Sequence, residues 1–110
     1  MEPIVNSFQI IDKTKKQFLV SIDKNFTGRE TSNIRRTINS LDFNHHDSLY
    51  FDTTAVEKID LAGVNEIIQI NEMMKSRKIN FILAYKRNSE MEQWVKNTGM
   101  HLYLDTAILP

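Results

Sequence analysis

The feature that most constrains this chain is an apolar segment that directly follows an amphipathic one. Residues 79–85, Ile-Asn-Phe-Ile-Leu-Ala-Tyr, are nearly continuous in apolar side chains, which is typical of a strand buried on both faces in a parallel sheet. The segment before it has apolar residues at helical spacing. They are Leu61, Val64, Ile67, Ile68, Ile70, Met73 and Met74. Because a helix that leads into a parallel strand is a crossover connection, these two segments predict an α/β fold.

Further strands are expected on both sides of this unit. Apolar and polar residues alternate at 8–10 and 18–22, which is the period of half-exposed strands. The polar residues 12–16 between them suit a hairpin, and we interpret their lysines as a solvated turn rather than a phosphate-binding patch. A polar loop at 44–47 precedes a short strand at 49–51, and residues 102–104 are expected to form a last edge strand.

Capping signals mark where the helices begin and end. Thr27 and Glu30 have the spacing of a capping box, and an apolar stripe at residues 34–41 follows them. Asp60 stands at the N-cap of the second helix. A second capping box, a tryptophan on the apolar stripe and a C-terminal glycine mark the third helix. These residues are Ser89, Glu92, Trp94 and Gly99. The chain is therefore expected to be a single domain, residues 1–110, with a mixed sheet of four to five strands and three to four helices.

The composition argues against several classes of protein. Lys and Arg number 14 and Asp and Glu number 14, so the formal net charge is zero and no basic excess indicates a nucleic-acid binder. The absence of cysteine rules out a disulfide scaffold, a thiolate zinc site and a cysteine nucleophile. The sequence shows no signal peptide and no run of roughly 18 apolar residues. We therefore expect a cytoplasmic protein with no nucleic-acid partner and no direct membrane insertion.

Known catalytic motifs are missing from the sequence. It contains no glycine-rich phosphate loop, no zinc-binding helix motif and no nucleophile elbow. Residues 45–47, His-His-Asp, are adjacent in a loop with only His101 left to complete a metal site, so we interpret them as a polar loop. Glu90 and Glu92 fit a helix N-terminus better than a catalytic carboxylate pair. We expect no metal, no cofactor and no enzyme activity.

Residues 51–64, Phe-Asp-Thr-Thr-Ala-Val-Glu-Lys-Ile-Asp-Leu-Ala-Gly-Val, resemble the central motif of the STAS domains of bacterial anti-sigma factor antagonists. In that family a strand ends in an aspartate, matched here by Asp52, and an Asp-Ser-Ser-Gly-Leu-type turn then opens a helix. Asp60, Gly63 and Val64 match that turn. Residues 95–100, Val-Lys-Asn-Thr-Gly-Met, resemble a second landmark, a helix that ends in Thr-Gly-Leu. The resemblance covers almost the whole chain and implies a STAS-like (SpoIIAA-like) fold.

The chain departs from this family at the switch residue. The family has a phosphorylatable serine or threonine after the aspartate of the turn, whereas this chain has Leu61 and then Ala62, which have no hydroxyl. The chain therefore cannot add a phosphate's nearly two negative charges at the family's usual position. The family's Gly-Glu-Leu-Asp-like landmark after the second strand is also missing. Thr53 and Thr54, which we expect in the preceding loop, are candidate substitute phosphoacceptors, although a structural role suits threonine there.

The resemblance implies a protein-binding domain in signalling and transcription regulation. Its partner would be a kinase-like anti-sigma factor or another regulatory protein, bound without phosphorylation at the usual site. The implied contact residues are Asp60, Leu61, Ala62, Gly63 and Val64. Leu61 either forms the centre of this interface or packs under a loop, with the binding surface elsewhere. Two alternatives remain: a STAS subunit that docks on the ATPase of a lipid-type ABC transporter, and a small-ligand or nucleotide-sensing domain. A homodimer is a further expectation.

Overall fold

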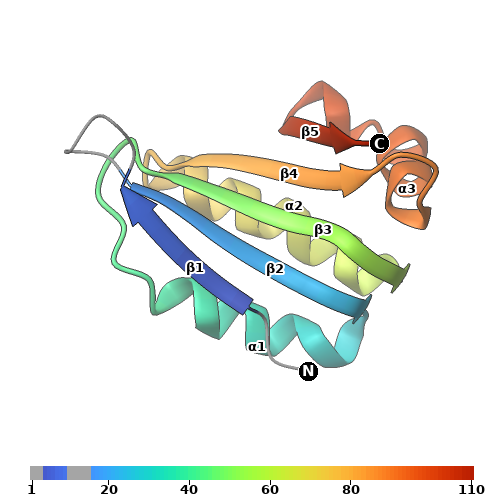
Figure 1. Cartoon of the computed structure of the whole chain (residues 1–110), viewed down its shortest axis with the longest axis horizontal. Helices are drawn as coiled ribbons and strands as arrows, with labels where there is room; N and C mark the ends of the chain where they lie inside the picture. Colours follow the sequence, from blue (N-terminus) through green and yellow to red (C-terminus); the bar gives the residue numbers. More distant parts are fainter. Residues whose placement is uncertain (1–3, 10–15) are drawn as a thin grey trace.

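The strands of the sheet lie side by side in the order in which they occur in the chain (Figure 1). The computed structural model describes residues 4–9 and 16–110, and these form one five-stranded sheet. β1 (Ile4–Gln9) pairs antiparallel with β2 (Lys16–Phe26). β3 (Ser48–Ile59), β4 (Asn80–Lys86) and β5 (Asp105–Leu109) each pair in parallel with the strand before them. The predicted mixed sheet is confirmed, while most of the predicted turn at 12–16 lies outside the described residues.

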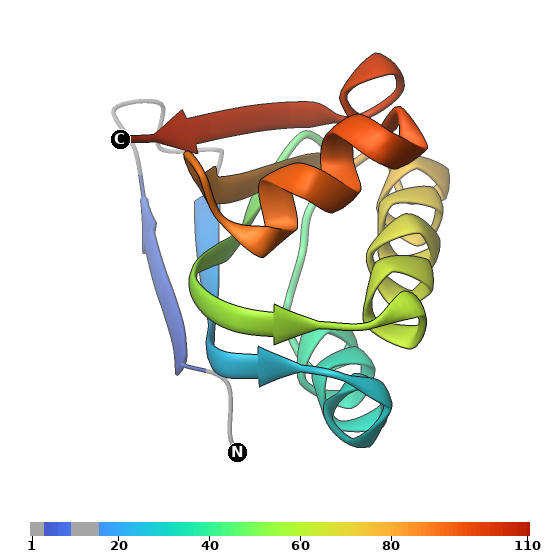
Figure 2. The ribbon, with the colours of Figure 1, turned by 90° about the vertical axis from the view of Figure 1, so that its right-hand side faces the viewer.

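Three α-helices connect the parallel strands and cover one face of the sheet (Figures 1 and 2). They are α1 (Gly28–Asn39), α2 (Leu61–Ser76) and α3 (Glu90–Thr98). Because parallel crossovers are right-handed and the sheet grows in one direction, all of them are expected on the same face. The described part of the sheet's opposite face carries no helix (Figure 1). The side chain of Glu30 is outside the described part of the chain, so the first capping box stays a prediction.

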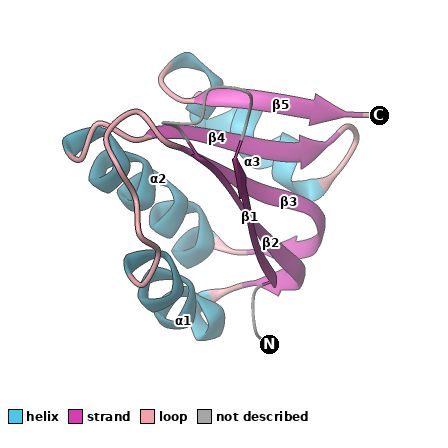
Figure 3. Ribbon diagram, turned by 60° about the vertical axis from the view of Figure 1, so that its left-hand side comes forward, coloured by secondary structure: helices cyan, strands magenta, loops and turns pink. Residues whose placement is uncertain are grey.

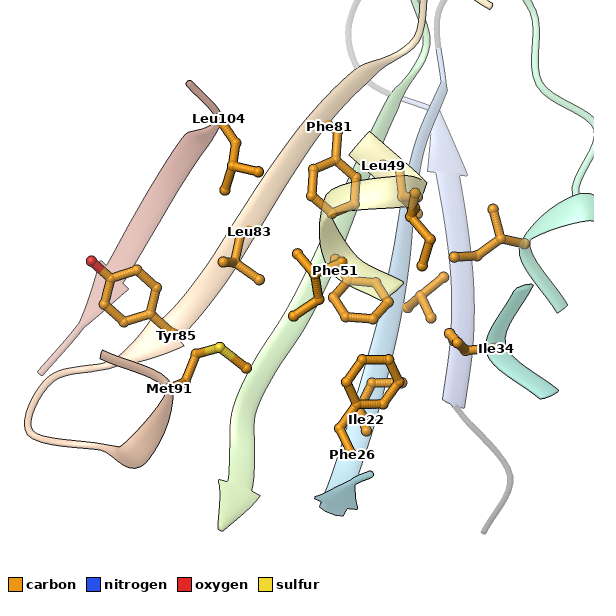
Figure 4. Packing of buried hydrophobic residues seen from close by; sticks show 14 of the residues in the cluster. Ile22, Phe26, Ile34, Leu49, Phe51, Phe81, Leu83, Tyr85, Met91 and Leu104 are labelled. Atoms are coloured by element: carbon orange, nitrogen blue, oxygen red, sulfur yellow. The ribbon is translucent and has the colours of Figure 1, made fainter. Parts of the chain in front are cut away.

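The hydrophobic core lies between the sheet and the helices (Figure 4). Its centre is the Phe51 ring, whose centroid lies 5.6 Å from that of Phe26 and 5.9 Å from that of Phe81. Alternate residues of β2, β3 and β4 point toward the helices, as the period of a strand requires. On the other face of β4, Ile82 is half-buried, so the prediction of a strand buried on both faces was wrong at this residue.

β3 is much longer than the three-residue strand expected at 49–51. It has 12 residues and includes Thr53 and Thr54, which were wrongly expected in a loop. The strand continues because β2 continues beside it, to the pair Phe26–Ile59, through two irregularities in register. These irregularities break the alternation of buried and exposed residues, which hid the strand in the sequence.

The last strand lies later in the chain than residues 102–104. Gly99 ends α3 in the left-handed conformation, with φ of 71°, as predicted for this glycine. A single 3-10 turn, η1 (Met100–Leu102), follows and takes up the first apolar residues. Of the three expected strand residues only Leu104 is buried, and the edge strand β5 begins at Asp105.

The loop from α1 to β3, residues 40–47, leads from the end of α1 to the start of β3 and is anchored by Asp47 (Figure 3). Asp47 is fully buried, and its two carboxylate oxygens accept the backbone N–H groups of Lys16 and Asn44, each at 2.8 Å. A buried carboxylate needs such partners, so its role is to hold the start of the parallel sheet together.

Candidate docking surface at the start of α2

Asp60 connects the beginnings of two helices. It follows β3 in an extended conformation and its Oδ1 accepts the N–H of Gly63 at 2.9 Å, which confirms the predicted N-cap of α2. Its Oδ2 accepts the N–H of Gly28, the first residue of α1, at 3.3 Å. The positive ends of two helix dipoles therefore share one carboxylate, whose charge stabilises both.

Gly63 allows α2 to start directly against the end of β2. A Cβ atom built on Gly63 would overlap the carbonyl oxygen of Phe26 and lie 2.9 Å from Cγ1 of Ile59. Real Cβ atoms do not approach other heavy atoms this closely, and the carbonyl belongs to backbone that pairs in the sheet. The position therefore requires glycine for close packing.

Leu61 is the exposed apolar residue of this turn. Its relative exposure is 60%, and Asp60 and Ala62 beside it are exposed as well. A large apolar side chain in water gains nothing from folding, because its surface is not removed from water. Of the two explanations for Leu61, packing under a described loop is therefore wrong.

The structure separates the five predicted contact residues into two groups. Asp60, Leu61 and Ala62 are exposed, whereas Gly63 is buried and Val64 is only 1% exposed. Val64 belongs to the hydrophobic core. The predicted surface is therefore available at its first three residues, and Gly63 and Val64 shape it from below.

The two candidate phosphoacceptors are hydrogen-bonded within β3. Thr53 is fully buried, and its hydroxyl donates to the carbonyl oxygen of Ala84 at 2.7 Å, so it is closed to a kinase. Thr54 is half-buried and donates its hydroxyl to Oδ1 of Asp52 at 2.6 Å. Oδ2 of Asp52 accepts the hydroxyl of Ser21 at 3.1 Å. The aspartate that matches the family's strand-end position thus ties β2 to β3.

α1 and α2 are also joined farther along their length. The guanidinium of Arg35 donates to both carboxylate oxygens of Glu66, at 2.7 and 2.8 Å, and to Oε1 of Gln69 at 2.7 Å. Arg35 is partly exposed, so this bidentate pair acts mainly through its geometry, which fixes one helix against the other. The surface around Leu61 therefore stands on two helices held together at two points.

The predicted polar loop keeps its histidines at the surface. His45 and His46 are exposed, while the neighbouring Asp47 faces inward to its backbone partners. Within the described ranges, no group of three or more His, Cys, Asp or Glu side chains is placed to hold a metal ion. No helix in the same ranges is long and apolar enough to span a membrane.

Sequence reasoning missed a second polar site, between α3, β4 and β5. Tyr85 lies in the apolar run of β4, where it reads as another core residue, yet it lines a cavity of about 410 Å³. Glu92 lines the same cavity and also accepts the N–H of Asn88 at 3.1 Å. Ser89 accepts the N–H of Glu92 at 3.2 Å, as the capping box predicts. Because this capping role explained Glu92 in the sequence, its place in the cavity was missed. A phenolic oxygen within a buried strand was the available signal.

Comparisons with known proteins bear on the fold. No protein-family model matches the sequence, and no curated protein sequence matches it. Among solved structures, this chain is similar to an uncharacterized protein from the DUF3478 family with a SpoIIAA-like fold, from Shewanella loihica PV-4. The match has a TM-score of 0.61 at 7% sequence identity and covers 98% of this chain and 86% of the other. The chain therefore has an α/β, SpoIIAA-like fold.

Proposed function

We propose that this chain is a non-catalytic, protein-binding regulatory domain of the STAS type, which docks through Asp60, Leu61 and Ala62. The observation that carries the proposal is the 60% exposure of Leu61 on a turn whose backbone is fixed by the Asp60 cap. A rigid, exposed apolar anchor is what a binding hot spot requires, because little order has to be gained on binding.

The partner in this proposal is a kinase-like anti-sigma factor or a related regulatory protein in the cytoplasm. The resemblance of residues 51–64 to the family motif supports this class, and the SpoIIAA-like fold is compatible with it. Leu61 and Ala62 have no hydroxyl, and the two threonines are engaged inside β3. The interaction would therefore be controlled by the amount of protein rather than by phosphate at this turn.

A matched pair of leucine substitutions tests the proposal. In Leu61→Arg the anchor is lost and a charge is placed in the interface, so affinity should fall by roughly thirtyfold or more, as for a hot-spot residue. Leu102→Arg is the control, because Leu102 is 79% exposed and lies in η1. Both variants should keep the wild-type free energy of unfolding, since exposed side chains contribute little to it.

The measurement is biosensor binding to purified kinase-like anti-sigma factors and to purified transporter ATPases from the source cell. Binding to an anti-sigma factor that only Leu61→Arg weakens supports the proposal. If the same selective loss occurs with an ATPase, the domain belongs to a transporter instead. Equal binding by both variants and the wild type would reject this surface.

A further inference from the structure

β5 is an edge strand with apolar side chains in the open. It pairs with β4 on one side, and no described strand lies on its other side. Ile108 and Leu109 are 46% and 47% exposed. An open edge presents unpaired backbone N–H and C=O groups, which is a template for another strand. Native proteins usually cover or charge such an edge, and the last residues of β5 do neither.

A groove runs beside this edge. α3 packs on β3 and β4, and the cavity of about 410 Å³ separates it from β5. Thr106 and Ile108 line the cavity from β5, and Val95 and Lys96 line it from α3. Alternate residues of a strand share a face, so Leu109 points to the other side of the sheet. The volume is sufficient for one long side chain of a bound segment.

The floor of the groove holds the hydroxyl of Tyr85. Tyr85 is only 3% exposed, and its hydroxyl points away from Phe51 toward β5 (Figure 4). No described residue forms a hydrogen bond with it. Burial, and then the negative charge of Glu92, raise the pKa of Tyr85 above its ordinary value. The hydroxyl is therefore neutral at physiological pH and free to accept a hydrogen bond from a bound group.

A buried carboxylate stands beside this hydroxyl. Glu92 is 6% exposed, and its Oε1 accepts the N–H of Asn88 at 3.1 Å. Within the described part of the chain its ion-pair partner is Lys96, whose Nζ lies 3.8 Å from Oε1 on a side chain that is 66% exposed. No described residue donates a hydrogen bond to Oε2. A buried carboxylate with one open oxygen favours a cationic donor.

We propose that the free edge of β5 binds an extended segment of a partner protein by strand addition, and that the segment places a lysine or arginine side chain in the groove, against Glu92 and Tyr85. The backbone of β5 would supply affinity, and the groove would supply specificity, as in other modes of strand addition. The site goes beyond the proposed function, because it shares no residue with the surface at the start of α2.

A library of extended nine-residue peptides tests this site. The peptides have valine or threonine at alternate positions, all other residues randomised, and no glycine or proline, and they are selected on the purified full chain. We expect enrichment of lysine or arginine at one position. A library without basic enrichment, or with acidic enrichment, would overturn the proposal.

Three substitutions then test whether the selected peptide binds in the groove. Tyr85→Phe removes only a hydroxyl that bonds to no described residue, so the chain should fold normally while affinity for the selected peptide falls roughly tenfold. Glu92→Gln keeps an acceptor for Asn88 and should weaken binding further. Lys96→Gln removes the competing cation and should strengthen binding a few-fold. Unchanged affinity in the first two variants would overturn the proposal.

N-methylation of the peptide backbone distinguishes a segment bound by strand addition from other occupants of the groove. Successive N–H groups of a strand point to opposite edges, so peptides N-methylated at odd or at even positions are blocked on different edges. Only one of the two isomers should lose binding. Equal binding of both isomers, or equal affinity for arginine amide alone, would show a small-ligand site. A dimer in sedimentation that Ile108→Lys dissolves would show that a second copy occupies the edge. Each of these results rejects a partner segment.

Discussion

The start of α2 and the edge at β5 are built in opposite ways. At the start of α2, the carboxylate of Asp60 binds two backbone N–H groups and the position of Gly63 has no room for a side chain. At the edge, the hydroxyl of Tyr85 has no partner among the described residues, and Ile108 stands half in water. The first region therefore shows a fixed shape with one exposed leucine, and the second offers open hydrogen-bonding capacity.

The largest expected effect is that of Gly63→Ala. The new methyl group would overlap the Phe26 carbonyl, which cannot move without disturbing β2, so we expect the free energy of unfolding to fall by roughly 3 kcal/mol. Urea unfolding followed by circular dichroism measures this. Gly28→Ala is the control, because its Cβ would lie 3.7 Å from Cβ of Ala62, an ordinary contact. Similar losses in both variants would mean that the close approach is not the cause.

The next effect compares the caps of the two regions. Asp60→Ala removes the acceptor for both Gly63 and Gly28, and we expect a loss of about 2 kcal/mol in the free energy of unfolding. Ser89→Ala removes the cap of α3 alone, for which we expect about 1 kcal/mol. Thermal and urea unfolding of both variants measure the two losses in the free energy of unfolding. An Asp60→Ala loss no larger than that of Ser89→Ala would show that the bond to Gly28 adds no stability.

The smallest effect belongs to the edge and depends on pH. The raised pKa of Tyr85 means that the folded state favours the neutral phenol. Its contribution to stability is therefore fully present below the ordinary tyrosine pKa of about 10 and is lost as pH rises through the folded-state value. Urea unfolding of the wild type between pH 8 and 11 should thus decline more steeply than that of Tyr85→Phe. Parallel profiles would contradict a raised pKa of Tyr85 in the folded state.

The periodicity of apolar residues was sufficient to predict the elements in which these residues recur at regular spacing. The α2 stripe from Val64 onward, the parallel strand after it and the caps at Asp60 and Ser89 follow from local rules of spacing and hydrogen bonding, and the structure confirms them. Leu61, the first residue of the predicted stripe, is exposed instead. The length of β3 did not follow, because the register shifts between β2 and β3 depend on a partner strand far away in the sequence. The position of β5 was missed because the apolar residues at 102–104, which resemble a strand, belong to the end of η1 and the turn after it.

The candidate site, like the fold, could be predicted from the sequence only in part. The turn at Asp60 has a sequence signature, and the structure places it at the surface as expected. Burial of Val64 agrees with its place in the apolar stripe, whereas burial of Gly63 depends on how α2 meets β2, which no local pattern encodes. The groove at Tyr85 depends on how far α3 covers the sheet, and an apolar run cannot show which of its members meets a cavity.

The bond from Gly28 to Asp60 joins residues 32 positions apart, so it closes a loop that contains all of α1 and β3. When the carboxylate of Asp60 moves away, the N–H groups of Gly28 in α1 and of Gly63 in α2 therefore lose their acceptor in the same event. Amide hydrogen exchange at Gly28 and Gly63 would consequently report a single opening reaction. A protein that binds the turn at Leu61 would therefore affect the beginnings of both α1 and α2.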